Sequence, residues 1–196
     1  MLELPLDFSS AVILEAGPLL LPGPIQGNPV ALRAFSDIEQ WREFVLGLQL
    51  RGSPPDVVRY NNERMLRVLY LSWLDASIIK LAELAALANL EAAINRRYSK
   101  KFRGLEAALR YLVKKGGVTD EALVTVQISG GAIVSNLLSK SKDGSGSGLS
   151  EIRNRLAHGD PFEAMPWAGL FEVVRDLIDF MYPAPASRSD RALSLP

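Results

Sequence analysis

The chain has 196 residues, contains no cysteine, and carries 22 basic and 22 acidic side chains, so its net charge at pH 7 is zero. A neutral chain has no global field that would attract nucleic acid or a membrane surface, so any anion site must be local. The absence of cysteine excludes a disulfide framework and is typical of the reducing cytoplasm, where we expect the protein to be located.

Membrane insertion and secretion are not expected from the apolar stretches of this sequence. The run 11–21 is interrupted by Glu15 and Pro18, and the run 70–90 contains charged residues. Neither run matches a secretory signal or a bilayer span, whereas the second suits a buried helix. The sequence therefore predicts no membrane partner.

Residues 1–55 are expected to form an N-terminal extension to the main fold. Prolines at positions 18, 22 and 24 are too close together for a helix, so the first 35 residues are expected to be extended or irregular, with room for one short strand at Ala11 to Leu14. Ser36 and Glu39 then match a capping box, and apolar residues recur at helical spacing. This pattern predicts a helix over 37–49.

Residues 56–182 change to an almost wholly helical pattern, which predicts an all-α fold, an up-and-down helical bundle. Pro55 is expected in the first turn of a helix that runs to about Ser72. No proline or glycine occurs from residue 56 to residue 103, and apolar residues form two stripes along 73–98. A helix that is apolar on two sides is typically central, so 73–98 is expected to lie in the middle of the bundle.

Glycines mark the next elements. Gly104 is expected to begin a helix that ends at the glycine pair 116–117. Thr119 is expected to cap a further helix, which should weaken at the glycine pair 130–131. The stretch 139–148, with the sequence SKSKDGSGSG, has the composition of a flexible loop.

Two more helices are expected after that loop. The first is short and has one apolar side, formed by Leu149, Ile152 and Leu156. The last is expected to start at Pro166 and to bury an apolar face that includes Trp167. Residues 183–196 have the composition of a disordered tail.

The candidate site lies in the segment 151–161, which holds the only histidine of the chain. Asn154 and His158 are four residues apart and so share one face of a helix, and the longer Arg153 can reach the same space. Arginine can hold a phosphate by two parallel hydrogen bonds, and histidine can transfer a proton near neutral pH. Because RNA carries its own nucleophile in the 2′-hydroxyl, a phosphodiester in RNA suits this set without a metal or a cofactor.

The motif Arg-Asn-x-x-x-His, formed by Arg153, Asn154 and His158 and followed by Gly159, resembles the signature of the HEPN superfamily (higher eukaryotes and prokaryotes nucleotide-binding). The resemblance covers roughly residues 56–182, and the sequence LEAAINRRY at 90–98 is similar to the end of the long helix in many such bundles. It implies a HEPN-like bundle and a homodimer with facing motifs. It also implies a metal-independent endoribonuclease that leaves 2′,3′-cyclic phosphate ends, acting as a toxin or in antiviral defence.

The resemblance and the chemistry together assign roles to the motif residues. His158 is expected to act as acid or base, Arg153 to stabilise the phosphorane, and Asn154 to position one of them. Glu91 is a candidate to orient Arg153 or an RNA hydroxyl. The alternative interpretation is structural: His158 would bond the last carbonyls of its helix, and Glu91 would be an exposed helix charge.

A second group of candidates lies at 96–103, where five bases and two aromatic residues occur in eight positions. These side chains can follow an RNA backbone, with rings that stack on bases. Equally open is a solvated helix end whose cations complement the helix dipole. The RNA-binding candidates are Arg96, Arg97, Tyr98, Lys100, Lys101 and Arg103, together with Arg155 of the motif helix.

The leading hypothesis from the sequence is a homodimeric endoribonuclease that cuts single-stranded RNA. An antitoxin or another protein is a further partner that such a role would bring. The alternative is a non-catalytic, HEPN-like scaffold or regulatory protein that binds a nucleotide, RNA or a protein partner. The neutral charge and the unmatched residues 1–55 favour this second hypothesis slightly.

Overall fold

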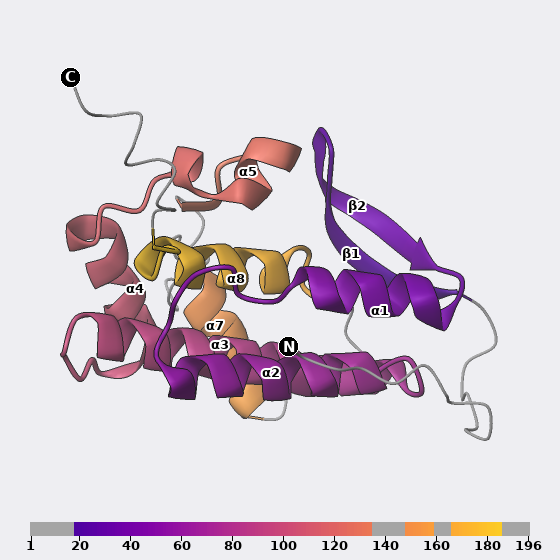
Figure 1. Ribbon diagram of the computed structural model, residues 1–196, viewed down its shortest axis with the longest axis horizontal. Coiled ribbons are helices and arrows are strands. Elements are labelled where there is room, and N and C mark those ends of the chain that lie inside the picture. The colour runs from indigo at the N-terminus through magenta and orange to yellow at the C-terminus, as the bar shows by residue number, and fades with distance from the viewer. Residues whose placement is uncertain (1–17, 135–147, 159–165, 186–196) are drawn as a thin grey trace.

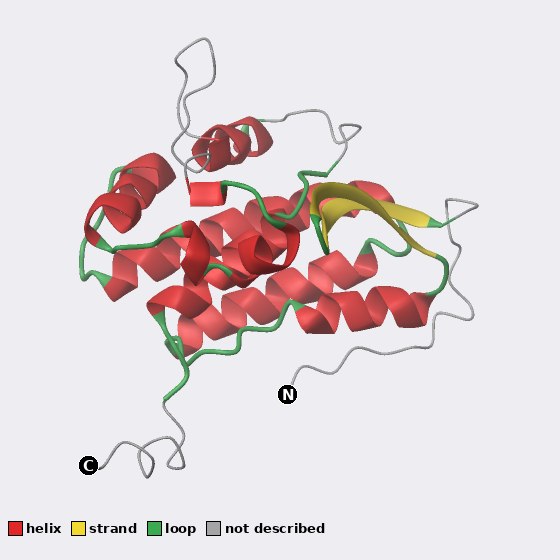
Figure 2. Ribbon diagram, turned by 90° about the horizontal axis from the view of Figure 1, so that it is seen from above, coloured by secondary structure: helices red, strands yellow, loops and turns green. Residues whose placement is uncertain are grey.

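A β-hairpin opens the part of the chain that the computed structural model describes, which comprises residues 18–134, 148–158 and 166–185 (Figure 1). β1 (Leu19–Ile25) pairs antiparallel with β2 (Asn28–Phe35) through a tight turn. Gly27 in this turn has a φ of 72°, a conformation that favours glycine. Figure 2 shows the hairpin lying against the helices near one end of the molecule.

The hairpin agrees with the extended chain expected over residues 18–35, although the sequence reasoning predicted no pairing of strands there. Leu19 and Leu21 are buried, while Leu20 between them is 43% exposed, the alternation of a strand with one buried face. A two-stranded sheet consists of edge strands, in which prolines at positions 22, 24 and 29 are tolerated despite their missing N–H groups. The strand expected at Ala11 to Leu14 lies outside the described residues.

α1 (Ile38–Gly47) begins one residue later than its predicted capping box implies. The cap is Asp37, whose Oδ1 accepts a hydrogen bond of 2.8 Å from the backbone N of Gln40. A carboxylate at this position satisfies a free N–H and complements the helix dipole, so it replaces Ser36 as the cap. Trp41 of α1 is fully buried, and its indole N–H donates to the carbonyl of Tyr70.

α2 (Asp56–Leu71) and α3 (Ile79–Arg97) pack against each other. Pro55 is the N-cap of α2 and so stands one position before the first turn in which it was expected, whereas Ser72 caps the end of the helix close to its predicted position. α3 also contacts α4, α7 and α8, which confirms that it is the central helix. It starts later than predicted because Asp75 caps a separate 3₁₀ turn at Ala76–Ile78.

α4 (Gly104–Lys115) buries the predicted apolar face on α3. A 3₁₀ turn at Asp120–Ala122 and the short α5 (Val124–Ser129) replace the longer helix expected after Thr119. Gly130, with a φ of 75°, ends α5, which confirms the expected weakening at this glycine pair.

α7 (Gly148–Ala157) and α8 (Leu170–Met181) complete the described helices. The prediction that the last helix starts at Pro166 is wrong, because Gly169 adopts a left-handed φ of 69° and the helix begins after it. Trp167 is 39% exposed instead of buried. Residues 139–147 of the expected loop and 186–196 of the expected tail lie outside the described residues.

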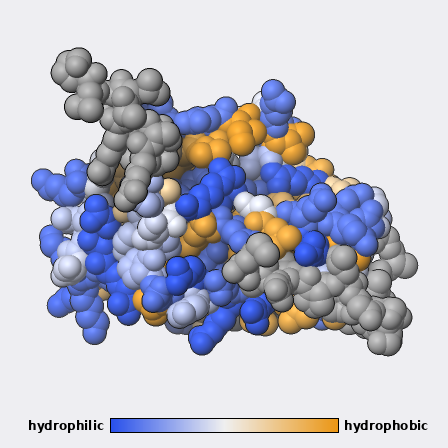
Figure 3. Space-filling model, viewed as in Figure 1, coloured by the Kyte–Doolittle hydropathy of each residue, from blue (hydrophilic) through white to orange (hydrophobic). Residues whose placement is uncertain are grey.

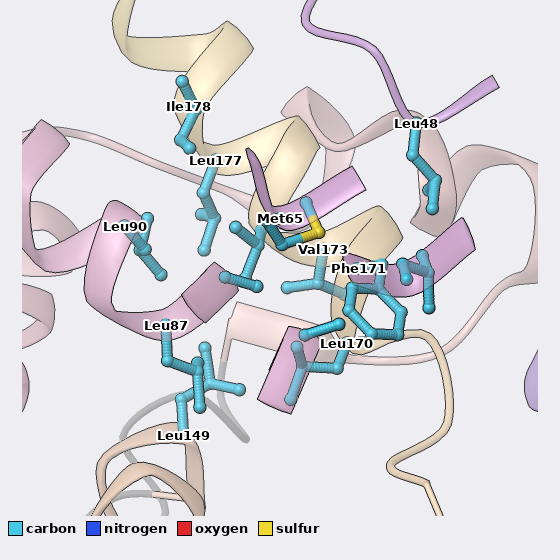
Figure 4. Packing of buried hydrophobic residues seen from close by; sticks show 14 of the residues in the cluster. Leu48, Met65, Leu87, Leu90, Leu149, Leu170, Phe171, Val173, Leu177 and Ile178 are labelled. Atoms are coloured by element: carbon cyan, nitrogen blue, oxygen red, sulfur yellow. The ribbon is translucent and has the colours of Figure 1, made fainter. Parts of the chain in front are cut away.

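One hydrophobic cluster joins the hairpin and α1 to the bundle. Figure 4 shows side chains of α2, α3, α7 and α8 turned towards one another, among them Met65, Leu87, Leu149 and Leu177. The same cluster contains Leu21 of β1. The described chain is mainly helical, with one small antiparallel sheet.

None of the helices in the described ranges combines the length and apolarity that crossing a bilayer requires.

Candidate functional site

The predicted motif lies on the outer side of α7. Leu149 and Ile152 are buried where the helix packs on α3 and α4, and Leu156 is half-buried. Because these apolar residues recur at spacings of three and four, they define the buried side of the helix, and the motif residues lie off that side. Asn154 is exposed, and the side chain of Arg153 is 36% exposed.

Arg153 has two polar neighbours, both of which are candidate site residues from the sequence. Its Nη1 donates a hydrogen bond of 3.1 Å to Oδ1 of Asn154. Its Nη2 lies 3.7 Å from Oε2 of Glu91 on α3. The guanidinium is therefore held from two sides at a partly exposed position, where an anion can still approach it.

His158 follows directly after α7. Its backbone N–H donates to the carbonyl of Asn154 at 2.9 Å, the i to i−4 bond of an α-helix, so these two residues share a face as predicted. The side chain is exposed, and the described residues provide no hydrogen bond to its imidazole. It is thus the backbone of His158, and not its ring, that bonds the last carbonyls in the described part of the chain.

The basic segment (residues 96–103) is held in a defined conformation. Oδ1 of Asn95 accepts a hydrogen bond of 2.9 Å from the backbone N of Phe102, and Ser99 has a φ of 48°. The rings of Tyr98 and Phe102 pack on Tyr111 of α4, with centroid distances of 4.9 and 5.2 Å. The segment is therefore fastened to α4 by its aromatic residues.

The predicted RNA-binding residues differ in accessibility. Tyr98 is half-buried, and burial raises the pKa of its hydroxyl, an effect that the nearby Arg97 guanidinium opposes. A ring in this position supports the loop, so the prediction that it stacks on a base gains no support from its packing. The basic candidates are exposed: Arg96, Arg97, Lys100, Lys101, Arg103 and, on α7, Arg155.

Glu91 and Asn95 link the motif to the basic segment. They are four residues apart on α3 and so lie on one face, separated by about 6 Å along the helix axis. Glu91 contacts Arg153, whereas Asn95 holds the backbone of Phe102. One face of the central helix therefore contacts both the motif and the basic segment.

The structure adds a basic groove along α4 that the sequence reasoning missed. The α4 groove is lined by Phe102, Arg103, Arg110, Tyr111, Lys114 and Lys115, among others. Arg110 and Lys114 are four residues apart and so lie on one side of α4, and Arg103 stands at the N-cap of this helix. This periodicity is the signal by which the sequence could have revealed the groove.

A second, more polar cavity of about 230 Å³ lies between the hairpin, α1, α5 and α8. Nη1 of Arg33 lies 2.9 Å from Oε1 of Glu172, and Arg175 pairs with Asp176. Burial raises the pKa of the Glu172 carboxyl, while Arg33 beside it acts in the opposite direction. These charges mostly satisfy one another, so we interpret the cluster as a structural tie. No sequence signal predicts the contact with Arg33, because this residue is far in the chain from its partners on α8.

The described residues contain no cluster of three or more side chains suited to hold a metal ion. Comparisons with family models, with curated proteins and with solved structures found no match to this chain.

Proposed function

We propose that the protein is a metal-independent endoribonuclease that cleaves single-stranded RNA with Arg153, Asn154 and His158. The observation that carries this proposal is the arrangement around Arg153, whose guanidinium is held by Asn154 and Glu91 on an accessible helix face. The HEPN-like motif gives the same residues the same roles. The site is proposed to form in a homodimer, in which two copies of the motif face each other.

The reaction follows from the chemistry of these groups. The 2′-hydroxyl of RNA attacks the adjacent phosphorus, so that a P–O2′ bond forms and the P–O5′ bond breaks. An imidazole takes the proton of the 2′-hydroxyl, and an imidazolium protonates the leaving 5′ oxygen. Arg153 stabilises the additional charge on the phosphorane oxygens. The products are a 2′,3′-cyclic phosphate and a 5′-hydroxyl, and a toxin or defence protein would use this reaction to disable RNA.

The test is cleavage of a mixed-sequence single-stranded RNA in EDTA. We expect the wild type to cleave it to products with 2′,3′-cyclic phosphate ends, identified by mass spectrometry. His158→Ala and Arg153→Ala should lose activity by at least about a hundredfold, the usual contribution of a positioned acid or base. Arg67→Ala, which removes an exposed arginine of α2, is the matched control and should retain activity. Equal cleavage by the wild type and His158→Ala would end the proposal.

The dimer is tested separately by sedimentation of the wild type and of Arg153→Ala. Both should sediment as folded dimers, because a partly exposed arginine contributes little to stability. Unfolding of Arg153→Ala would instead make Arg153 a structural residue. A monomeric wild type would contradict the facing arrangement of the two motifs.

The second candidate is a non-catalytic protein that binds a nucleotide, RNA or a protein partner through the same surface. The Glu91 carboxylate favours this second candidate. It neutralises part of the charge of Arg153, and the guanidinium then stabilises a phosphorane less well. RNA binding without cleavage products would support this candidate. Growth arrest on expression of the chain, relieved by a co-expressed partner protein, would instead support a toxin held by an antitoxin.

A further inference from the structure

The positive charge of this neutral protein is concentrated in one stretch. Residues 96–115 contain eight of the 22 basic residues and only one of the 22 acidic residues, Glu106. The stretch thus has a net charge of +7, and the remainder of the chain has a net charge of −7. A local concentration of this size creates an anion-attracting surface that the overall charge conceals.

The fold arranges this charge along one helix. α4 buries Leu105, Leu109 and Leu112, and its opposite side faces the α4 groove. The twelve residues of α4 span about 18 Å, so bases at both ends of the helix can contact successive phosphates of one strand. Figure 3 shows a largely hydrophilic surface at the α4 end of the molecule.

Several of these bases are accessible to an external anion. Arg103, Lys114 and Lys115 are exposed, and none of them pairs with an acid among the described residues. Arg110 is bound to Glu106 at 2.6 Å, and Lys100 lies 4.2 Å from the centre of the Tyr111 ring. The packing of Tyr98 and Phe102 on Tyr111 joins the basic segment to α4, so the charges are held as one surface.

We propose that the α4 groove binds the phosphate backbone of single-stranded RNA and guides it towards Arg153. This inference rests on the proposed function for the identity of the ligand. Its geometric support is α3, which carries Glu91 at the motif and Asn95 at the basic segment on one face. RNA that follows the groove onto the basic segment thereby comes next to the motif.

The surface suits a nucleic acid better than a membrane. Proteins that lie on a bilayer insert large apolar side chains beside their basic residues. In the described chain, none of the large exposed apolar residues belongs to residues 96–115; the closest in sequence is Leu81 on one side and Ile128 on the other. The phosphate groups of a single nucleic-acid strand provide the negative charge that complements these bases, and they do so at repeated intervals without apolar insertion.

The experiment measures RNA binding in the absence of cleavage. The full chain carrying His158→Ala is titrated against a fluorescent, mixed-sequence single-stranded RNA at several salt concentrations, and anisotropy gives Kd. Lys114→Gln with Lys115→Gln in the same background removes two charges of the α4 groove. We expect this variant to bind about tenfold more weakly, and the slope of log K against log salt to fall by about 1.4, since each phosphate neutralised by the protein contributes about 0.7.

The matched control is Arg64→Gln with Arg67→Gln, which removes the same charge from α2. It should leave Kd and the salt slope close to those of the parent. If both double variants weaken RNA binding equally, the effect depends on net charge and not on the α4 groove, and the proposal is overturned. Circular dichroism melting of both variants shows whether either is unfolded. If the Lys114 and Lys115 variant is unfolded, Arg103→Gln, outside the helix, takes its place, and the salt slope should then fall by about 0.7.

The outcomes separate this inference from the proposed function. RNA binding that depends on Lys114 and Lys115, with no cleavage by the wild type, supports the groove and contradicts the ribonuclease. Cleavage by the wild type with unchanged RNA binding in the double variant supports the ribonuclease and contradicts the groove. Vesicles of anionic phospholipid and polyglutamate serve as competitors, and tighter binding of either than of RNA would overturn the groove as an RNA site.

Discussion

Glu91 of α3 and Arg153 of α7 face each other, with 3.7 Å between Oε2 and Nη2. The carboxylate holds the guanidinium in place, but it also offsets part of its charge. These two effects make opposite contributions to RNA binding and to cleavage. The Glu91 side chain is therefore expected to influence the two steps in different directions.

Glu91→Gln should bind RNA more tightly and cleave it more slowly. Removal of a negative charge favours the approach of a phosphate, whereas loss of the ion pair lets Arg153 move from its position. We expect kcat to fall about tenfold, a cost of about 1.4 kcal/mol in the transition state. Single-turnover cleavage and anisotropy measure the two effects. Asp56→Asn removes the partner of Arg59 in an exposed ion pair and should change neither quantity.

Arg33→Met tests the structural tie between the hairpin and α8. The side chain of Glu172 is only 9% exposed, so loss of Arg33 leaves a buried carboxyl group without its ion-pair partner. We expect the free energy of unfolding to fall by about 3 kcal/mol, as for other buried pairs that lose one member. Urea denaturation measures the change. Arg59→Met breaks an exposed pair and should cost less than about 1 kcal/mol; equal losses would place Arg33 among the surface charges.

Asp179 should make stability depend on pH. Burial raises the pKa of its carboxyl group, although the N–H groups of Gly52 and Arg51 oppose the rise. The folded protein therefore holds this proton more tightly than the unfolded chain. The resulting stabilisation is complete below the unfolded pKa and is lost as the pH rises through the folded pKa.

Asp179→Asn isolates this contribution, because Oδ1 accepts both backbone hydrogen bonds and an amide oxygen can replace it. The free energy of unfolding of the wild type minus that of the variant should decrease as the pH rises from the unfolded pKa through the folded pKa. Urea titrations across the acidic range provide the measurement. A constant difference would show that the pKa of Asp179 is the same in the folded and unfolded states.

Substitution of alanine for two glycines near the end of α1 should change the stability of the protein in opposite directions. A Cβ at Gly52 would collide with the backbone carbonyl of Tyr182, whereas a Cβ at Gly47 would meet no atom within 4 Å. Gly52→Ala should therefore destabilise the protein by about 1–3 kcal/mol, in the range of other overpacked sites. Gly47→Ala, in a helix, should stabilise it by about 0.5–1 kcal/mol. Thermal melts of the two variants measure the changes. Shifts of the melting temperature in the same direction would contradict the difference in local geometry.

The helices with strong apolar periodicity were predictable from the sequence. The two apolar stripes of α3 predicted its central position, and the glycines around α4 predicted both of its ends. Arg153 and Glu91, both candidates from the sequence, lie 3.7 Å apart between Nη2 and Oε2, and the orienting role of Glu91 stays a prediction. In the helices the decisive information is local, because residues three and four positions apart share a helix face.

The hairpin, the start of α8 and the buried charge cluster were not predictable by the same reasoning. Prolines normally argue against strands, and only the pairing of β1 with β2 shows that each is an edge strand. The left-handed conformation of Gly169 delays α8, although Pro166 matches a helix start. Arg33 and Glu172 meet only in three dimensions, and apolar spacing carries no information on such a pair.

The loop after α1 is fastened to the last helix of the described chain. The N–H groups of Arg51 and Gly52 donate to Asp179, and Ser53 donates to the carbonyl of Tyr182. During synthesis on the ribosome, these donors emerge long before their acceptors have been translated. The loop at residues 51–53 therefore cannot reach its final arrangement until α8 has been translated, and its docking is expected to finish after α8 has left the exit tunnel.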